Sequence, residues 1–308
     1  MRRVELAEQC RDADSIPKVP EAGQVMERDG TRVQVMHNGV VVEEGCYYGE
    51  MTTEVVRRLR GHHEPQQELA FHAVIEQLRS DTESPVVVEL GSYWAFYSLW
   101  ALHEIPGTRC VLVEPDPNHL EVGQRNLALN GKEARSIQAA VGVPDGAVVP
   151  DFVCESDKVA REVPLATVEG IMAREELPRI DLLLCDAEGS ELDMIAGARS
   201  ALMAGRIRFL VISTHHHRIS GDPLMHSRCL QGLTFMGAHV IAEHTVSESF
   251  SGDGLIVASF DPRDNELTVE LSHARARQSL FGEPEHYLAA AMTERDELAK
   301  ELERLRAQ

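Results

Sequence analysis

The chain has 308 residues, 43% of them hydrophobic, and its 50 Asp and Glu against 30 Lys and Arg give a formal net charge of −20. Proteins that bind nucleic acid neutralise phosphates with basic residues, and anionic membrane surfaces attract basic segments, so this charge argues against both kinds of partner. The hydrophobic content suffices for a packed core and excludes wholesale disorder.

The six cysteines lie far apart and form no C-x-x-C pair, which is typical of reduced thiols in a cytoplasmic protein. No apolar run approaches the roughly 18 residues that a membrane-spanning helix needs. Arg2 and Arg3 lead into Glu5 rather than into the apolar stretch of a signal peptide. We therefore expect a cytoplasmic protein with no membrane partner.

Residues 1–80 predict an N-terminal cap that contains a β-hairpin and helices. Asn38-Gly39 lies between apolar flanks, and these two residues accept the positive φ angles of a hairpin turn. Residues 54–59 have apolar side chains at helical spacing. Pro65 is suited to the first turn of a second helix, which should continue through Leu78.

Residues 81–262 predict an α/β domain with a doubly wound, seven-stranded, mostly parallel sheet. The β-branched run at 86–90 is typical of a parallel strand covered on both faces. Similar short runs follow at 110–113, 137–141, 180–185, 209–213, 238–242 and 255–260. Most are separated by amphipathic stretches, as this fold requires. The last two have no convincing helix between them, which predicts that the last strand is antiparallel.

Residues 263–308 predict a C-terminal helical extension. Leucines and alanines over 285–308 repeat at a spacing close to heptads, interrupted by Arg295. Three heptads are a weak coiled-coil signal, so three arrangements stay open. The helix could pack on its own domain, form a homodimer with a second subunit, or remain solvated.

Two loops in the sequence indicate a nucleotide-like ligand. Residues 89–93 (Glu-Leu-Gly-Ser-Tyr) follow the first strand, where sheets of this kind bind such ligands, and Gly91 permits a close backbone approach. The G-x-G-x-x-G cradle for a pyrophosphate is missing, which disfavours an NAD-dependent oxidoreductase. Glu114 follows the next strand and is placed to accept hydrogen bonds from ribose hydroxyls. S-adenosylmethionine (SAM) has this ribose and no phosphate.

Five segments in order resemble the FkbM-type SAM-dependent methyltransferases, which have the class I methyltransferase fold; they are 88–92, 114–117, 126–131, 139–142 and 186–191. The resemblance implies that SAM is the cofactor. It also implies the cofactor-binding residues, which are Glu89, Gly91, Ser92, Tyr93, Glu114, Pro115, Ala139, Ala140 and Asp186. Plain core packing is the alternative for Ala139 and Ala140.

The expected ends of the fourth and fifth strands carry residues suited to catalysis. Methyl transfer to a hydroxyl needs alignment and removal of the acceptor's proton. Asp186 and Glu188 follow the fourth strand, and a run of three histidines follows the fifth. Neighbouring strand ends should converge on one pocket, so we predict His215 as general base, oriented by Asp186 with Glu188 nearby.

Other uses of these residues stay open. Asp186, His215 and His216 could hold a divalent cation that polarises the acceptor oxygen. Alternatively, His216 and His217 position the substrate. His63 and Glu64, before the second predicted helix, are further candidates for substrate contact, with a loop or helix-cap role as the alternative.

Together these features predict an enzyme that transfers a methyl group from SAM to a hydroxyl of a small molecule. A sugar or a glycosylated secondary metabolite is the acceptor class that the family resemblance favours. An N- or carboxyl-methyltransferase and a non-catalytic SAM- or nucleotide-binding scaffold are the alternatives. The acidity of the chain disfavours an anionic acceptor.

Overall fold

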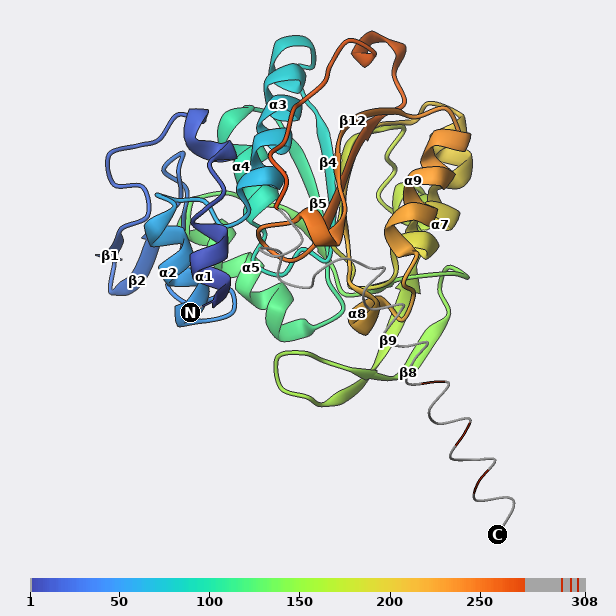
Figure 1. Cartoon of the computed structure of the whole chain (residues 1–308), viewed down its shortest axis with the longest axis horizontal. Coiled ribbons are helices and arrows are strands. Elements are labelled where there is room, and N and C mark those ends of the chain that lie inside the picture. The colour runs from blue at the N-terminus through green and yellow to red at the C-terminus, as the bar shows by residue number, and fades with distance from the viewer. Residues whose placement is uncertain (1, 275–294, 296–299, 301–303, 305–308) are drawn as a thin grey trace.

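The computed structural model describes residues 2–274 together with 295, 300 and 304 (Figure 1). Apart from residues 295, 300 and 304, the predicted C-terminal helix lies outside these residues, and so does the proposed dimer contact. Among the residues that are described, no helix combines the length and the apolarity needed to span a membrane.

The centre of the molecule is a seven-stranded sheet in the order β12-β13-β11-β10-β4-β5-β6. β13 runs antiparallel to both of its neighbours, whereas the pairs from β11 to β6 are parallel. This confirms the predicted sheet. Its strands are β4 (Val86–Leu90), β5 (Arg109–Val113), β6 (Arg135–Ile137), β10 (Ile180–Cys185), β11 (Ile207–Thr214), β12 (His239–His244) and β13 (Gly254–Ser259).

The register of the central strands brings the predicted functional loops to one edge. Leu90 at the end of β4 lies opposite Val113 of β5 on one side and Cys185 of β10 on the other. The chain therefore leaves three neighbouring strands at the same level, as ligand-binding sheets of this class require.

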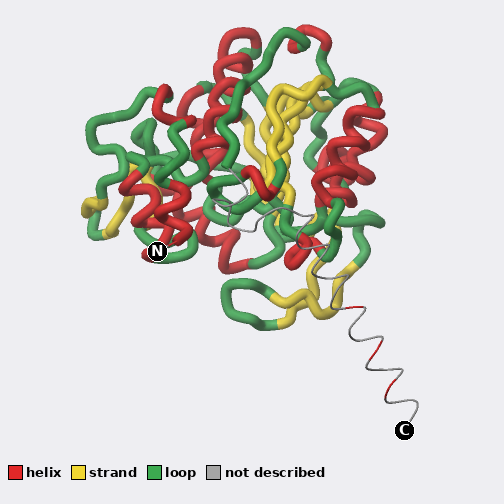
Figure 2. The backbone as a smooth tube through the Cα atoms, viewed as in Figure 1, coloured by secondary structure: helices red, strands yellow, loops and turns green. Residues whose placement is uncertain are grey.

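Helices cover both faces of the sheet, and Figure 2 shows the strands lying between them. Alternate residues of each strand point to opposite faces: Val87 packs with the helices of one face and Val88 with those of the other. The first layer comprises α3 (Pro65–Asp81), α4 (Phe96–Glu104) and α5 (Pro117–Leu129). The second comprises α6 (Val168–Arg174), α7 (Glu191–Met203) and α9 (Met225–Phe235).

The N-terminal region contains a small antiparallel sheet of β1 (Val25–Arg28), β2 (Thr31–Val35) and β3 (Val41–Glu43). The predicted hairpin is present as β2 and β3, and Pro65 begins α3 as predicted. Asn126 and Asn130 of α5 accept hydrogen bonds from the backbone N–H groups of Glu43 and Val41, at 2.9 and 3.0 Å. These contacts fasten the small sheet to the domain. The N-terminal region also contains the helices α1 (Arg2–Ala7), η1 (Asp12–Ser15) and α2 (Glu50–Arg58).

The third predicted strand, 137–141, is not continuous, and this prediction was wrong. Its first part joins the main sheet as β6, whereas β7 (Ala140–Val141) leaves it and pairs with β9 (Ala160–Ala166). β8 (Val148–Val153) completes this second small sheet, which projects from the domain (Figure 1). Its strands are largely exposed, so they lack the buried apolar run used to recognise the others. The remaining elements are α8 (His217–Ser220), η2 (Val246–Glu248) and η3 (Pro262–Asp264).

Candidate active site

A cavity of about 350 Å³ lies at the carboxyl ends of the central strands. This volume falls within the usual range for small-molecule sites. Loops after β4, β5, β10 and β11 form its walls, and the N-terminal region, the β8–β9 hairpin and the connection between β12 and β13 complete them.

Gly91 brings the loop after β4 into contact with the end of β10. Its φ is +75°, and a Cβ at this position would lie 1.8 Å from the carbonyl oxygen of Asp186. The backbone N–H of Asp186 also donates to the carbonyl of Leu90, at 2.8 Å. Since only glycine avoids this clash, the close approach of the two loops depends on it.

Backbone N–H groups hold the Glu114 carboxylate at the cavity wall. It accepts hydrogen bonds from the N–H of Tyr93 at 3.1 Å and from that of Asp116 at 3.0 Å. Burial raises the pKa of Glu114 to about 8. The carboxyl group is thus fixed in position before any ligand binds.

The residues beside Glu114 offer polar groups suited to SAM. Glu89 accepts a hydrogen bond from the N–H of Ser98 at 3.0 Å, and burial raises its pKa to about 7. Ser92 lines the cavity, and its buried Oγ has no hydrogen-bond partner among the described residues. Two carboxyl groups and an unsatisfied hydroxyl match a cofactor with a ribose and cationic groups, so the residues present fit SAM.

Most of the other predicted cofactor residues line the same cavity. Tyr93, Pro115, Ala140 and Asp186 do so, and Tyr93 stacks on His119 with ring centroids 3.6 Å apart. Ala139 does not. It is 1% exposed and packs in the hydrophobic core beneath α6 and α7, because the chain turns out of the sheet between β6 and β7.

Asp186, His215 and Glu191 form a linear arrangement at the ends of β10 and β11. Nε2 of His215 lies 3.1 Å from Oδ1 of Asp186, and Nδ1 lies 2.5 Å from Oε1 of Glu191. The side chain of Asp186 is 43% exposed, whereas Glu191 at the start of α7 is fully buried. The predicted pair of Asp186 and His215 is therefore in contact, with an unpredicted carboxylate behind it.

The charge of His215 follows from these neighbours. Burial disfavours its charged form, yet the hydrogen bonds to Asp186 and Glu191 outweigh burial and raise the pKa of the imidazole well above its usual value. Asp253 adds a third carboxylate, 3.9 Å from Nε2. Three acidic groups therefore surround one ring.

Residues 85–240, just over half of the chain, match the family model described as the methyltransferase FkbM domain. The chain belongs to this family of SAM-dependent methyltransferases. The match covers the central strands whose loops form the cavity. No match was found among the curated proteins.

Solved structures similar to this FkbM methyltransferase share little sequence with it. Precorrin-6y C5,15-methyltransferase from Geobacter metallireducens GS-15 is 15% identical, with a TM-score of 0.39 over 62% of this chain and 87% of that one. TrmK from M. capricolum, solved in complex with S-adenosyl-homocysteine, is 12% identical, with a TM-score of 0.37 over 74% of this chain and 85% of that one. The METTL16 methyltransferase domain is 12% identical, with a TM-score of 0.41 over 64% of this chain and 68% of that one.

Other predicted residues of the FkbM methyltransferase occupy different places. Glu188 lines the cavity beside the hydroxyl of Tyr48, which lies 3.4 Å from its carboxylate. His216 caps α8 and His217 begins that helix; neither lines the cavity. Direct substrate contact by these two histidines is not supported by this arrangement.

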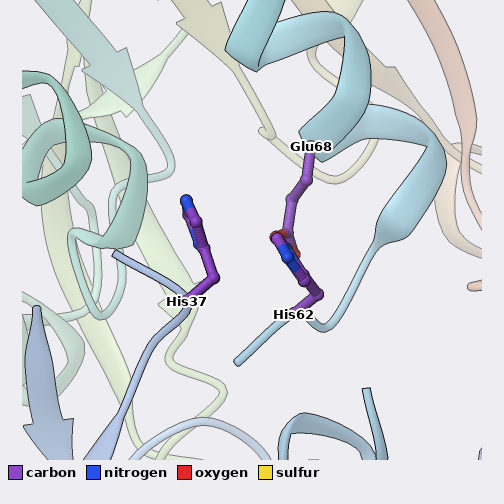
Figure 3. Close-up of side chains that lie close together, drawn as sticks. All are labelled: His37, His62 and Glu68. Atoms are coloured by element: carbon purple, nitrogen blue, oxygen red, sulfur yellow. The ribbon is translucent and has the colours of Figure 1, made fainter. Parts of the chain in front are cut away.

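The predicted metal ligands do not form a metal-binding group among the described residues. Among the described residues, only His37, His62 and Glu68 offer three ligand atoms close together. Figure 3 shows these three side chains, and the rings of His37 and His62 stack with centroids 4.5 Å apart and planes at 16°. Because imidazole lone pairs lie in the ring planes, two stacked rings cannot point at one ion. This buried cluster packs as a structural contact between the N-terminal region and α3.

His63 and Glu64 do line the cavity, and the ring of His63 lies 4.9 Å from that of Trp94, in the loop after β4. Glu64 accepts a hydrogen bond from the hydroxyl of Tyr97 at 3.2 Å, and burial raises its pKa to about 7. His63 lies between Glu64, at 3.4 Å, and Glu68, at 2.8 Å. The N-terminal region therefore contributes titratable groups to the site, and substrate contact by these two residues stays a prediction.

Sequence reasoning missed several lining residues of the methyltransferase cavity. They come from α1, the loop before α2, α3, the β8–β9 hairpin and the β12–β13 connection, and include Arg3, Tyr47, Gln67, Phe152, Glu155 and Asp253. Tyr47 stacks on Trp94 with centroids 4.6 Å apart, which builds an aromatic wall. These positions follow no strand of the parallel sheet and belong to no motif, so only the tertiary fold brings them to the cavity.

Proposed function

We propose that the protein catalyses SAM-dependent O-methylation of a small hydroxylated molecule, such as a sugar or a glycosylated metabolite. The observation that carries this proposal is the contact between Asp186 and His215 at the cavity wall. A neutral hydroxyl is a poor nucleophile and needs a partner that accepts its proton. A protein that only binds SAM needs no such pair.

The residues divide into two groups. The loops after β4 and β5 hold the cofactor, with Glu114 at the ribose and Glu89 and Ser92 at the amino-acid end. When bound, SAM supplies an activated methyl group on a sulfonium sulfur. Asp186 and His215 hold the acceptor hydroxyl, and the aromatic wall around Tyr47 and Trp94 excludes water from it.

The test is a screen for transfer of a labelled methyl group from SAM to sugars, phenols and amines, followed by mapping of the methylated atom. We expect label on an oxygen of a hydroxylated acceptor. We also expect Asp186→Asn to lower kcat at least 100-fold, in line with the loss of an acid–base group, with little change in S-adenosylhomocysteine affinity. Label found only on nitrogen or on a carboxyl group would overturn the proposal.

The same assay tests the need for a metal. The two nitrogens of His215 are already engaged by carboxylates, so we propose transfer without a metal. Activity should survive EDTA and dialysis. Loss of activity in chelator, restored by a divalent cation, would contradict this part of the proposal.

A further inference from the structure

We infer that Glu191 holds His215 as an imidazolium and that Asp186, rather than His215, takes the proton from the acceptor hydroxyl. This inference rests on the proposed O-methylation and reverses the roles that the sequence suggested for Asp186 and His215. It also adds Glu191 as a positioning residue.

Both ring nitrogens of His215 face carboxylate oxygens, so both need a proton to donate. Nδ1 of His215 lies 2.5 Å from a carboxylate oxygen of Glu191, and Nε2 lies 3.1 Å from one of Asp186. A neutral imidazole has one N–H, so its other nitrogen would face a carboxylate with a lone pair. Only the imidazolium donates to both, and charge-assisted hydrogen bonds of this kind are the strong ones.

Carboxylates from several elements surround the His215 ring. Asp186 approaches from the end of β10, Glu191 from α7 and Asp253 from the β12–β13 connection. Glu188, in the same loop as Asp186, interacts with His215 at longer range. Each carboxylate favours the protonated ring, and burial weakens the screening of these interactions by water.

Asp186 and His215 differ in whether they can take a proton from an acceptor in the cavity. An imidazolium has no lone pair with which to accept a proton. Asp186 contacts the ring and also reaches the cavity, since its side chain is 43% exposed. Glu191 is fully buried and cannot reach an acceptor. Of Asp186, His215 and Glu191, Asp186 is therefore the residue that both reaches the acceptor hydroxyl and has a lone pair to accept the hydroxyl proton.

Bonds and protons balance in the proposed methyl transfer. The acceptor oxygen forms a bond to the methyl carbon, and the bond from that carbon to sulfur breaks with its electron pair left on sulfur. The hydroxyl proton passes to a carboxylate oxygen of Asp186. His215 keeps its two protons throughout and holds Asp186 in place.

Glu191 fixes the ring from behind. The oxygen that contacts His215 also accepts a hydrogen bond from the backbone N–H of Gly189 at 3.1 Å. Gly189 belongs to the loop that carries Asp186, with a φ of +110°. One carboxylate of Glu191 therefore ties together the loop after β10 and the histidine after β11, which makes it a positioning residue.

NMR of the ligand-free protein, with ¹⁵N in the histidine rings, tests the charge directly. At pH 8 we expect both ring nitrogens of His215 to show the shifts of an imidazolium, assigned by loss of the signals in His215→Asn. Glu191→Gln keeps the shape and removes the charge, so the ring should become neutral at pH 8. Glu243→Gln is the matched control, because Glu243 contacts His226 at 2.7 Å outside the cavity. A neutral His215 ring in the wild type at pH 8 would overturn the inference.

Kinetics with the acceptor from the screen test the roles. If the imidazolium is required, kcat should fall as pH rises through the pKa of His215, and Glu191→Gln should move this fall to lower pH. We expect Glu191→Gln to lower kcat about 10-fold or more with S-adenosylhomocysteine affinity kept, and Glu191→Asp to recover part of the loss. A kcat that instead rises with pH through a pKa that vanishes in His215→Asn would make His215 the base. That result would overturn the inference about Asp186 and leave the proposed O-methylation intact. Methylation at nitrogen would refute the proposed O-methylation, while the NMR measurement of the His215 charge would still hold.

Discussion

The proposed cofactor site depends on single side chains, and among them Glu114 has the best-defined position. Its two backbone hydrogen bonds fix the carboxylate where a ribose is expected. We predict that Glu114→Ala weakens the binding of S-adenosylhomocysteine about 10-fold, since each of the two ribose hydrogen bonds that it would lose contributes about 0.5–1.5 kcal/mol. Calorimetry measures this loss. Glu121→Ala, on the exposed face of α5, is the control and should bind normally; unchanged affinity in Glu114→Ala would remove Glu114 from the cofactor site.

The sequence identified residues such as Glu89, Glu114 and Asp186 because each lies at or just beyond the end of a recognisable buried strand. Parallel strands end at one edge, so local reading and topology suffice to group them. Glu191 escaped this reasoning because it stands at the start of a helix, where an acidic residue is ordinarily explained by the helix dipole. Its contact with His215 spans 24 residues and depends on how α7 packs.

The connection between β12 and β13 is an element whose position depends on one side chain of another element. Gln66 of α3 donates to the carbonyls of Glu248 at 3.2 Å and Ser272 at 2.7 Å, and accepts from the N–H of Phe250 at 2.9 Å. Phe250 is buried, and Asp253 of the same connection lines the cavity. The connection is therefore a fastened wall of the site.

We predict that Gln66→Ala loosens this wall. The N–H of Phe250 and the carbonyl of Ser272 lose a partner, whereas the carbonyl of Glu248 keeps the N–H of Ala274 at 2.8 Å. The free energy of unfolding should therefore fall by about 1–3 kcal/mol. Urea unfolding measures the loss, and limited proteolysis should show faster cleavage within 245–253. Gln77→Ala, on the exposed part of the same helix, is the control. Equal stability and equal cleavage in the two variants would show that Gln66 does not fasten the connection.

The elements that the sequence missed share a physical cause. β8 and β9 alternate between exposed and half-buried residues, and much of their stability comes from pairing with each other. Hydrophobic pattern is the main signal for strands in a sequence, and it is weak where a hairpin projects into solvent. Yet Phe152, Val153 and Glu155 of this hairpin reach the cavity. The sheet and the loops at its carboxyl edge could be predicted, whereas the hairpin that completes the cavity wall could not.

The whole molecule should respond to pH because its cavity keeps several carboxyl groups protonated. Burial raises the pKa of Glu114 to about 8 and those of Glu89 and Glu64 to about 7. From pH 6.5 to 8 the folded state retains protons that these groups have lost in the unfolded chain. The free energy of unfolding therefore falls as pH rises, by up to about 1.4 kcal/mol per pH unit for each proton retained.

Above about pH 7.5 the histidines do not reverse this fall in the free energy of unfolding. Burial lowers the pKa values of five histidines, and these side chains are largely neutral in both states from about one pH unit above their unfolded pKa of roughly 6.5; they are His37, His72, His119, His216 and His244. His215, whose pKa is raised, favours the folded state at low pH and loses this contribution as pH rises. We predict that the Tm of the ligand-free protein falls steadily from about pH 7.5 to about pH 8.5 in calorimetric scans. Glu114→Gln removes one retained proton and should flatten the fall, whereas Glu121→Gln should not; a Tm that is constant or rises over this range would mean that the cavity carboxyl groups are already ionised in the folded protein.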